Sequence, residues 1–306
     1  MAAYVARRLV QSLLILLGIS IITFALLYLL PADPARQIAG RSASPEMVAS
    51  IRHQLGLDQP FYLQYLRYAG RLLHGNLGRS YVQRTDVTAL ILTRLPPTLV
   101  LMVGSIATEL ALGLVMGMTA ALKRNTAVDR VLMVISFVGV SAPQFVLGIL
   151  LLYVFAVRLA WFPIGGYGSL RHLVLPALTL GILGAGWYAR MMRSSLLDVL
   201  QQDYLRTAHA KGLSGAVVLL RHALPNAILP VIAMIGLDIG TFMSGIVVVE
   251  SVFGWPGIGQ RTWQAIQRVD IPIIMGVTLV SACAIVLGNL LADLIAPAID
   301  PRIKLR

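Results

Sequence analysis

Six long apolar runs constrain this chain more than any other feature, because each can cross a lipid bilayer as a helix. They cover residues 9–30, 96–122, 131–157, 173–190, 227–249 and 273–296. About 20 apolar residues are needed to span the hydrocarbon core of a membrane as an α-helix. The mean hydropathy of +0.80 and the charged fraction of 12% also lie outside the range of soluble globular domains. The sequence therefore predicts an all-α integral membrane protein with about six spanning helices.

The first run and the basic residues predict the orientation of the chain. The run Leu9–Leu30 follows Arg7 and Arg8, is longer than the apolar part of a signal peptide and lacks a clean A-x-A cleavage site, so we expect a retained helix. With the N-terminus in the cytoplasm, the short cytoplasmic segments hold thirteen basic residues and the short outer loops hold four. This bias satisfies the positive-inside rule. We therefore expect a multi-pass protein with both termini in the cytoplasm.

The spans divide the chain into four predicted parts. These are an N-terminal transmembrane helix (1–31), a long outer segment (32–95), a transmembrane core (96–297) and a cytoplasmic tail (298–306). In the outer segment, Ser44-Pro45-Glu46 and Asp58-Gln59-Pro60 have the residue pattern of helix starts. An amphipathic stretch follows each, too short and too polar to span. We expect two short helices packed at the outer surface.

A polar, basic stretch from Asp203 to Pro230 interrupts the apolar core, on the predicted cytoplasmic side. Its apolar residues recur at helical spacing, with basic residues between them. Gly212 breaks the pattern in the middle, and Pro225 opens the next apolar run as a proline at a helix start should. The pattern predicts two short helices at a glycine hinge, within cytoplasmic helices at 196–225, with one apolar face available to a partner.

The spacing within this stretch resembles the cytoplasmic loop of bacterial ABC-importer permeases, EAA-x3-G-x9-I-x-LP. Gly212, nine intervening residues, His222, one further residue and Leu224-Pro225 match that spacing. Arg206-Thr207-Ala208 stands where the consensus has EAA, and His222 replaces the isoleucine. These departures are similar to the peptide-permease branch, which carries a D-Y-x-R-T-A-x-A-K-G run. The resemblance implies docking to an ATPase subunit through Asp203, Arg206, Thr207, Ala208, Ala210, Lys211, Gly212, Leu224 and Pro225.

Other motifs extend the resemblance to the dipeptide, oligopeptide, glutathione and nickel permeases over almost the whole chain. They are LGLDQP at 55–60, GNLGRS at 75–80, the run at 250–259 similar to E-x-x-F-x-x-P-G-x-G, and Asp300-Pro301-Arg302-Ile303. In the run at 250–259, Glu250, Phe253, Pro256, Gly257 and Gly259 are expected to form a tight re-entrant turn. We expect this turn to shape the outer mouth rather than to gate it.

The resemblance implies a type I ABC-importer transmembrane fold in the bacterial cytoplasmic (inner) membrane. It also implies a set of partners: a homologous second permease, two ABC ATPases and a periplasmic or lipid-anchored substrate-binding protein. ATP and Mg would be bound by the ATPases. Peptides are the first choice of substrate, with nickel, a metal chelate or glutathione as alternatives.

The inventory of reactive residues predicts a transport subunit that is not an enzyme and binds no cofactor. None of the three lysines lies in a G-x4-G-K-[ST] phosphate loop, and no catalytic or metal-binding constellation stands out. The single cysteine, Cys283, excludes an intrachain disulfide. The net charge of +12 is scattered among apolar segments, which argues against a nucleic-acid partner.

Two acidic residues, Glu109 and Asp238, lie near the middle of predicted spans, where a charge is costly. They could line the pathway and attract a cationic substrate end, such as a peptide amino terminus. They could instead hold a polar group on a neighbouring helix. An ion-coupled secondary carrier that uses both carboxyl groups is the alternative from another class.

Overall fold

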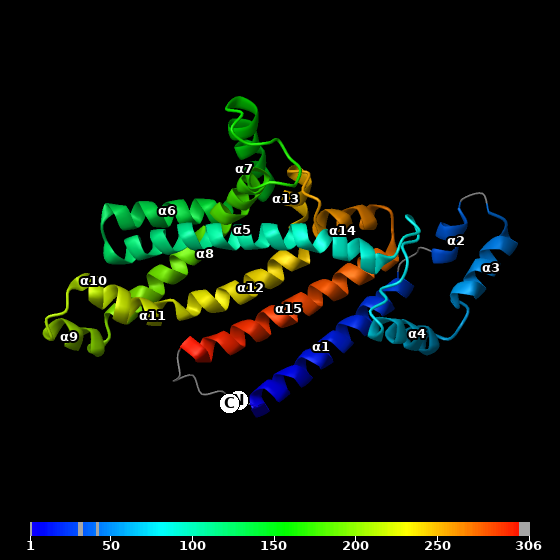
Figure 1. Ribbon diagram of the computed structural model, residues 1–306, viewed down its shortest axis with the longest axis horizontal. Helices are drawn as coiled ribbons and strands as arrows, with labels where there is room; N and C mark the ends of the chain where they lie inside the picture. The colour runs from blue at the N-terminus through cyan, green and yellow to red at the C-terminus, as the bar shows by residue number, and fades with distance from the viewer. Residues whose placement is uncertain (1, 30–32, 41–42, 300–306) are drawn as a thin grey trace.

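The computed structural model describes residues 2–29, 33–40 and 43–299, and Figure 1 shows an elongated bundle of helices. Its elements are α1 (Ala2–Leu29), α2 (Pro34–Ala39), α3 (Pro45–Leu55), α4 (Phe61–Leu73), α5 (Val87–Leu122), α6 (Ala127–Ser141), α7 (Gln144–Leu151), η1 (Leu152–Arg158), α8 (Leu170–Leu200), α9 (Asp203–Ala210), α10 (Gly215–Val217), η2 (Val218–Ala223), α11 (Leu224–Ala227), α12 (Leu229–Gly245), α13 (Val247–Val252), α14 (Ile258–Gln267) and α15 (Ile271–Ile299). The segments η1 and η2 are π-helical. The described residues contain one isolated β-bridge, Arg79 to Asp86, and no longer strand.

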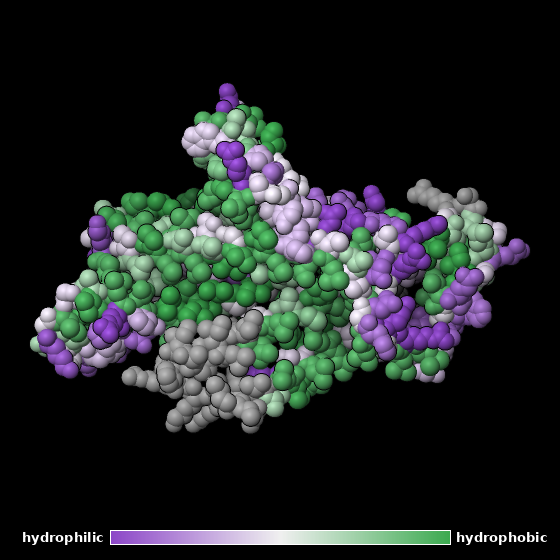
Figure 2. All heavy atoms as spheres, viewed as in Figure 1, coloured by the Kyte–Doolittle hydropathy of each residue, from purple (hydrophilic) through white to green (hydrophobic). Residues whose placement is uncertain are grey.

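The long helices are the membrane-spanning elements. Within the part of the chain that the structure describes, four helices are long and apolar enough to cross a bilayer individually, in α1, α5, α8 and α15. Two bent pairs, α6 with α7–η1 and α10–α11 with α12, qualify as one span each. Counted in this way the described residues contain up to six spans, which agrees with the prediction. Figure 2 shows an apolar surface over the long helices and polar residues gathered at the two ends.

Several helix boundaries differ from the prediction. The second spanning helix begins at Val87 rather than at Pro96, because Asp86 accepts hydrogen bonds from the amides of Thr88 (2.7 Å) and Ala89 (3.3 Å) and so caps it. The proline pair at 96–97 lies inside this helix. α8 continues to Leu200, so the separate short helices after it begin at Asp203 rather than at residue 196.

Pro143 lies inside the third apolar run, 131–157, where a proline is expected to kink a helix, and the observed bend is far sharper than such a kink. The axes of α6 and α7–η1 differ by 103° at the break before Gln144. α7 therefore stands away from the bundle in Figure 1. Ala142 and Gln144, at this turn, line a neighbouring cavity.

Glycines in α5 allow its close packing on α8. A Cβ at Gly113 would lie 2.4 Å from Tyr188 Cβ, and one at Gly117 would lie 2.5 Å from the carbonyl oxygen of Ala189. Neither position has room for a side chain, so the small-residue spacing brings the two backbones together. The packed helices α5 and α8 form one wall of the cavity described below.

The segment after α1 forms both predicted short helices and one that was not predicted. α3 begins after Ser44, whose hydroxyl accepts a hydrogen bond from the Met47 amide (3.3 Å), and α4 begins after Pro60. The additional helix, α2, follows Asp33 and has only six residues. Phe24 of α1, Tyr68 of α4 and Met275 of α15 pack in one apolar cluster that joins this segment to the spanning helices.

Candidate functional site

A cavity of about 410 Å³ lies among the spanning helices and contains both intramembrane acids. α5 contributes Glu109, α8 contributes Tyr188, and α12 contributes Asp238. The break between α6 and α7 supplies further wall residues. The structure therefore brings together two carboxyl groups that are 129 positions apart in the sequence.

The two carboxyl groups have different surroundings. The Tyr188 hydroxyl donates a hydrogen bond to Asp238 Oδ2. Glu109 is only 4% exposed, and its Oε2 atom is buried with no hydrogen-bond partner among the described residues. The carboxyl groups of Glu109 and Asp238 are also close enough to interact electrostatically. A buried carboxyl oxygen without a partner is unfavourable, so this site would be stabilised by a donor that enters the cavity.

A glycine on the facing helix makes room for Glu109. A Cβ at Gly184 would lie 2.0 Å from Glu109 Oε1. Any larger residue on this turn of α8 would displace the carboxyl group. The rest of the lining is apolar or uncharged: Val140, Ala142, Gln144, Leu180, Leu183, Trp187, Met234, Leu237, Thr241 and Phe242. No basic side chain lines this cavity in the described part of the chain, so its field favours a cation.

The predicted coupling segment, Asp203–Pro225, forms the short helices α9 to α11 at the end of the molecule opposite α2–α4 (Figure 1). Gly212 has φ +80°, the left-handed conformation that a hinge between two helices requires and that glycine adopts without strain. Asn226 Nδ2 donates a hydrogen bond to the Tyr204 hydroxyl (2.9 Å) and holds α9 beside α11. The predicted hinge and helix pair are present.

The predicted coupling residues divide into packed and exposed groups. Ala208 is buried with Leu205 in the cluster that also contains residues of α8 and η2. Asp203 and Arg206 lie on the surface and form an exposed ion pair at 3.7 Å. The exposed apolar residues of the segment are Tyr204, Leu213, Val217 and Leu220. Packing thus holds one face of the segment to the spanning helices and leaves the other face open.

The turn at 250–259 is built around a buried carboxyl group. Glu250 is fully buried and accepts hydrogen bonds from the Thr98 hydroxyl (2.9 Å) and the Gln260 amide (2.7 Å). A Cβ at Gly257 would lie 1.9 Å from Glu250 Oε1, so only glycine fits there. The Trp255 indole donates to the Pro97 carbonyl (2.9 Å). Sequence reasoning identified Glu250 and Gly257 but missed Thr98 and Trp255.

The structure does not describe the C-terminal motif, and it bears on a metal site only within the described residues. The motif Asp300-Pro301-Arg302-Ile303 and most of the tail at 298–306 lie outside the described residues. Within the described residues, no group of three or more His, Cys, Asp or Glu side chains could hold a metal ion.

Comparison with known proteins agrees with the resemblance seen in the motifs. Residues 113–305 match the family described as "Binding-protein-dependent transport system inner membrane component", and residues 1–102 match its N-terminal region. The glutathione transport system permease protein GsiC of Salmonella paratyphi A is 42% identical over 304 residues, which cover 99% of each chain. GsiC of Escherichia coli strain K12 is 41% identical over the same coverage.

Solved structures show the same fold at low sequence identity. An inward-facing MetNI methionine ABC transporter matches with a TM-score of 0.58 at 19% identity, over 69% of this chain and 96% of that chain. An amino acid ABC transporter matches with a TM-score of 0.51 at 17% identity, over 69% and 94%. The family match, the GsiC relatives and the shared fold together argue against the alternative of an ion-coupled secondary carrier. The chain belongs to the family of binding-protein-dependent transport system inner membrane components, and it is the permease subunit of an ABC importer in the inner membrane.

Proposed function

We propose that this chain forms half of the pathway for a small peptide with a free amino terminus, and that glutathione, the substrate named for its relatives, is a member of that class. The observation that carries the proposal is the cavity that holds Glu109 and Asp238 without a basic residue in its described lining. An α-ammonium group supplies three N–H donors and a positive charge. It would satisfy the Glu109 oxygen that has no partner in the protein.

The chemistry of the lining favours an ammonium group over a bare nickel ion. Nickel binds well to imidazole and thiolate ligands. The described lining offers carboxyl groups, a phenol and an amide, but no histidine or cysteine. Nickel within a peptide-like chelate remains compatible with the same site, because its ligands would travel with it.

The driving force would come from partner subunits. We expect ATP and Mg on two ABC ATPases, which dock on the exposed face of the coupling segment, and no cofactor on this chain. A homologous second permease would complete the pathway. A soluble or lipid-anchored binding protein would deliver substrate at the α2–α4 end, which is the outer end if both termini lie in the cytoplasm. The bias of basic residues supports this orientation.

Uptake by the complete transporter in proteoliposomes tests the cavity. Asp238→Asn and Glu109→Gln should each raise the KM for glutathione roughly 10- to 150-fold, because a hydrogen bond to a charged group contributes about 1.5–3 kcal/mol. Glu46→Gln makes the same change at an exposed position of α3, outside the cavity, and should leave the preference for the free over the acetylated peptide unchanged. A peptide with an acetylated amino terminus should be transported poorly by the wild type and no worse by the cavity variants. Equal losses for free and acetylated peptides would refute recognition of the ammonium group.

A second experiment tests the hinge. Gly212→Val should uncouple ATP hydrolysis from uptake, because a β-branched residue resists φ +80°. No atom lies within 4 Å of a Cβ at this position, so the backbone is strained and no side chain is displaced. Gly212→Asn is the matched control, since asparagine tolerates the left-handed conformation. Normal uptake by the valine variant would count heavily against a coupling role for the hinge.

A further inference from the structure

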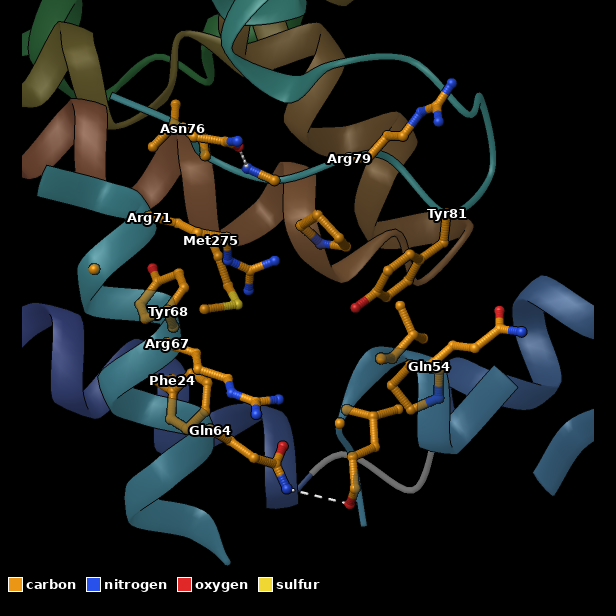
Figure 3. A pocket seen from close by; sticks show the side chains of 18 of the residues that line it. Phe24, Gln54, Gln64, Arg67, Tyr68, Arg71, Asn76, Arg79, Tyr81 and Met275 are labelled. Atoms are coloured by element: carbon orange, nitrogen blue, oxygen red, sulfur yellow. Dashed lines mark hydrogen bonds between the residues drawn. The ribbon is translucent and has the colours of Figure 1, made fainter. Parts of the chain in front are cut away.

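A second cavity, of about 890 Å³, lies at the α2–α4 end of the molecule. Figure 3 shows it between α4 on one side and the end of α3 on the other, with the 74–81 segment and the start of α15 above it. It shares no lining residue with the cavity that holds Glu109 and Asp238. Its volume falls in the range of about 300–1,000 Å³ that small-molecule sites occupy.

The lining of this cavity has an apolar wall and a basic wall. Phe24 of α1, Tyr68 of α4 and Met275 of α15 form the apolar wall, where the cavity meets the ends of two spanning helices. The charged residues of the lining are four arginines and one aspartate: Arg52, Arg67, Arg71, Arg79 and Asp33. The balance is strongly positive, and a positively charged concave site favours an anion.

Arg67 and Arg71 are the arginines available to that anion. They lie on successive turns of α4, and in Figure 3 both guanidinium groups extend into the open space. No carboxylate among the described residues forms an ion pair with either of them. Arg52, by contrast, pairs with Asp33 at 2.5 Å. Arg79 donates to a backbone carbonyl (2.7 Å) and points away from the cavity.

The surrounding chain holds these groups in position. A Cβ at Gly56 would lie 2.6 Å from Arg67 Nη1, so the glycine that ends α3 lets the guanidinium group lie against the backbone. Gln64 ties α4 to the preceding turn through two backbone carbonyls (2.7 and 3.1 Å). Asp270 accepts a hydrogen bond from the Tyr81 amide (3.1 Å), and the Tyr81 hydroxyl is directed into the cavity.

The cavity lies beside the apolar surface that the chain offers to lipid. Tyr62, Leu66 and Leu73 are 63%, 62% and 88% exposed. They lie at helical spacing on one side of α4, roughly opposite Arg67 and Arg71. Such an amphipathic helix lies in the membrane interface. α1, which contributes the apolar wall at Phe24, is buried over only 11% of its span.

We propose that Arg67 and Arg71 bind the phosphate of an anionic phospholipid, whose acyl chains lie along α1. Guanidinium groups match phosphate oxygens in geometry and charge, and the Tyr81 hydroxyl adds a donor. Inorganic phosphate has the same charged group, but it would leave the apolar wall uncovered. The lipid belongs to the outer leaflet under the proposed orientation. Binding itself requires neither ATP nor transport, so this inference can fail while the proposed function stands.

Lipid retention by the complete transporter tests the site. The transporter is placed in nanodiscs of phosphatidylcholine doped with phosphatidylglycerol, released, and weighed by native mass spectrometry with its bound lipids. Wild type should retain phosphatidylglycerol in preference to phosphatidylcholine. Arg67→Gln/Arg71→Gln should weaken that preference about 30-fold, since each basic residue near an anionic membrane surface contributes about 1 kcal/mol. Arg84 is also exposed and lies between α4 and α5, outside the cavity lining. Arg84→Gln should therefore leave the lipid preference unchanged.

Four results would overturn the proposal. One is an equal retention of both lipids by the wild type, and another is an unchanged preference in the double variant. The third comes from nanodiscs of phosphatidylcholine alone: tight binding of inorganic phosphate there, without lipid selectivity, would assign the site to a soluble anion. Arg67→Lys/Arg71→Lys guards against misfolding, because lysine keeps the charge and should retain part of the preference. If the double glutamine variant instead loses only its binding protein, the basic wall is a protein-docking surface.

Discussion

The Thr98 hydroxyl joins three parts of the structure, and its removal gives a prediction whose size can be worked out. It donates to Glu250 (2.9 Å) and accepts a hydrogen bond from the Ile258 amide (2.8 Å). Thr98 and Ile258 are each 2% exposed, and Glu250 is fully buried. α5, α13 and the start of α14 are therefore fastened by one oxygen atom.

Thr98→Val keeps the shape of the side chain and removes the oxygen. Loss of a hydrogen bond to a buried carboxylate is worth about 1.5–3 kcal/mol, and an unsatisfied buried amide adds about 1–3 kcal/mol. We expect the free energy of unfolding to fall by about 2.5–6 kcal/mol. The change in packing should contribute little, because valine and threonine have nearly the same volume.

Unfolding of the purified transporter in mixed micelles, followed by circular dichroism, measures the effect. Thr98→Ser is the matched control, since it keeps both hydrogen bonds and loses only a methyl group. It should be much more stable than the valine variant. If the two variants unfold alike, the hydroxyl is not what holds the turn, and the argument from Glu250 fails.

Three further predictions follow from polar contacts and close approaches. Asp129→Ala breaks the bidentate ion pair with Arg193 (both contacts 2.7 Å) and should lower the free energy of unfolding by about 3 kcal/mol in the same assay. Gly184→Ala should lower it by about 1–3 kcal/mol through overpacking, and a variant as stable as wild type would show that the facing carboxyl group moves freely. A hydrogen bond from His53 lowers the pKa of Asp58 below its ordinary 3.8, so this contact stabilises the α3–α4 turn above that pH and is lost as the pH falls through the lowered value. His53→Ala should return the Asp58 titration, followed by carbon-13 NMR, toward 3.8.

The sequence was most informative where a local rule is strong. The six apolar runs predict the spans because a bilayer requires about 20 apolar residues. Ser44 and Pro45 predict the start of α3, and Gly212 predicts the hinge, because caps and left-handed turns depend on few residues. The start of α5 was wrong for a similar reason: a proline pair is typical of a helix start, but Asp86 is the residue that caps the helix.

The parts that could not be predicted depend on contacts between distant segments. Nothing near Tyr188 in the sequence indicates that its hydroxyl reaches Asp238 on another helix. Thr98 is one of many threonines in apolar surroundings, and its role depends on a turn more than 150 residues away. The 103° break at Pro143 was predicted only as a kink, because the size of a bend is set by what packs beside it.

Buried carboxyl groups in this apolar chain separate into two kinds by how their oxygen atoms are satisfied. Glu109 and Glu250 both lie against a glycine that would clash if it carried a side chain, Gly184 and Gly257 respectively. The oxygen atoms of Glu250 receive protein donors, which is what a fixed turn requires. One oxygen of Glu109 receives none, and Glu109 lines a cavity. Both residues are buried, yet their surroundings differ: Glu250 is satisfied within the chain, and we propose that the site of Glu109 is completed by a donor on the substrate.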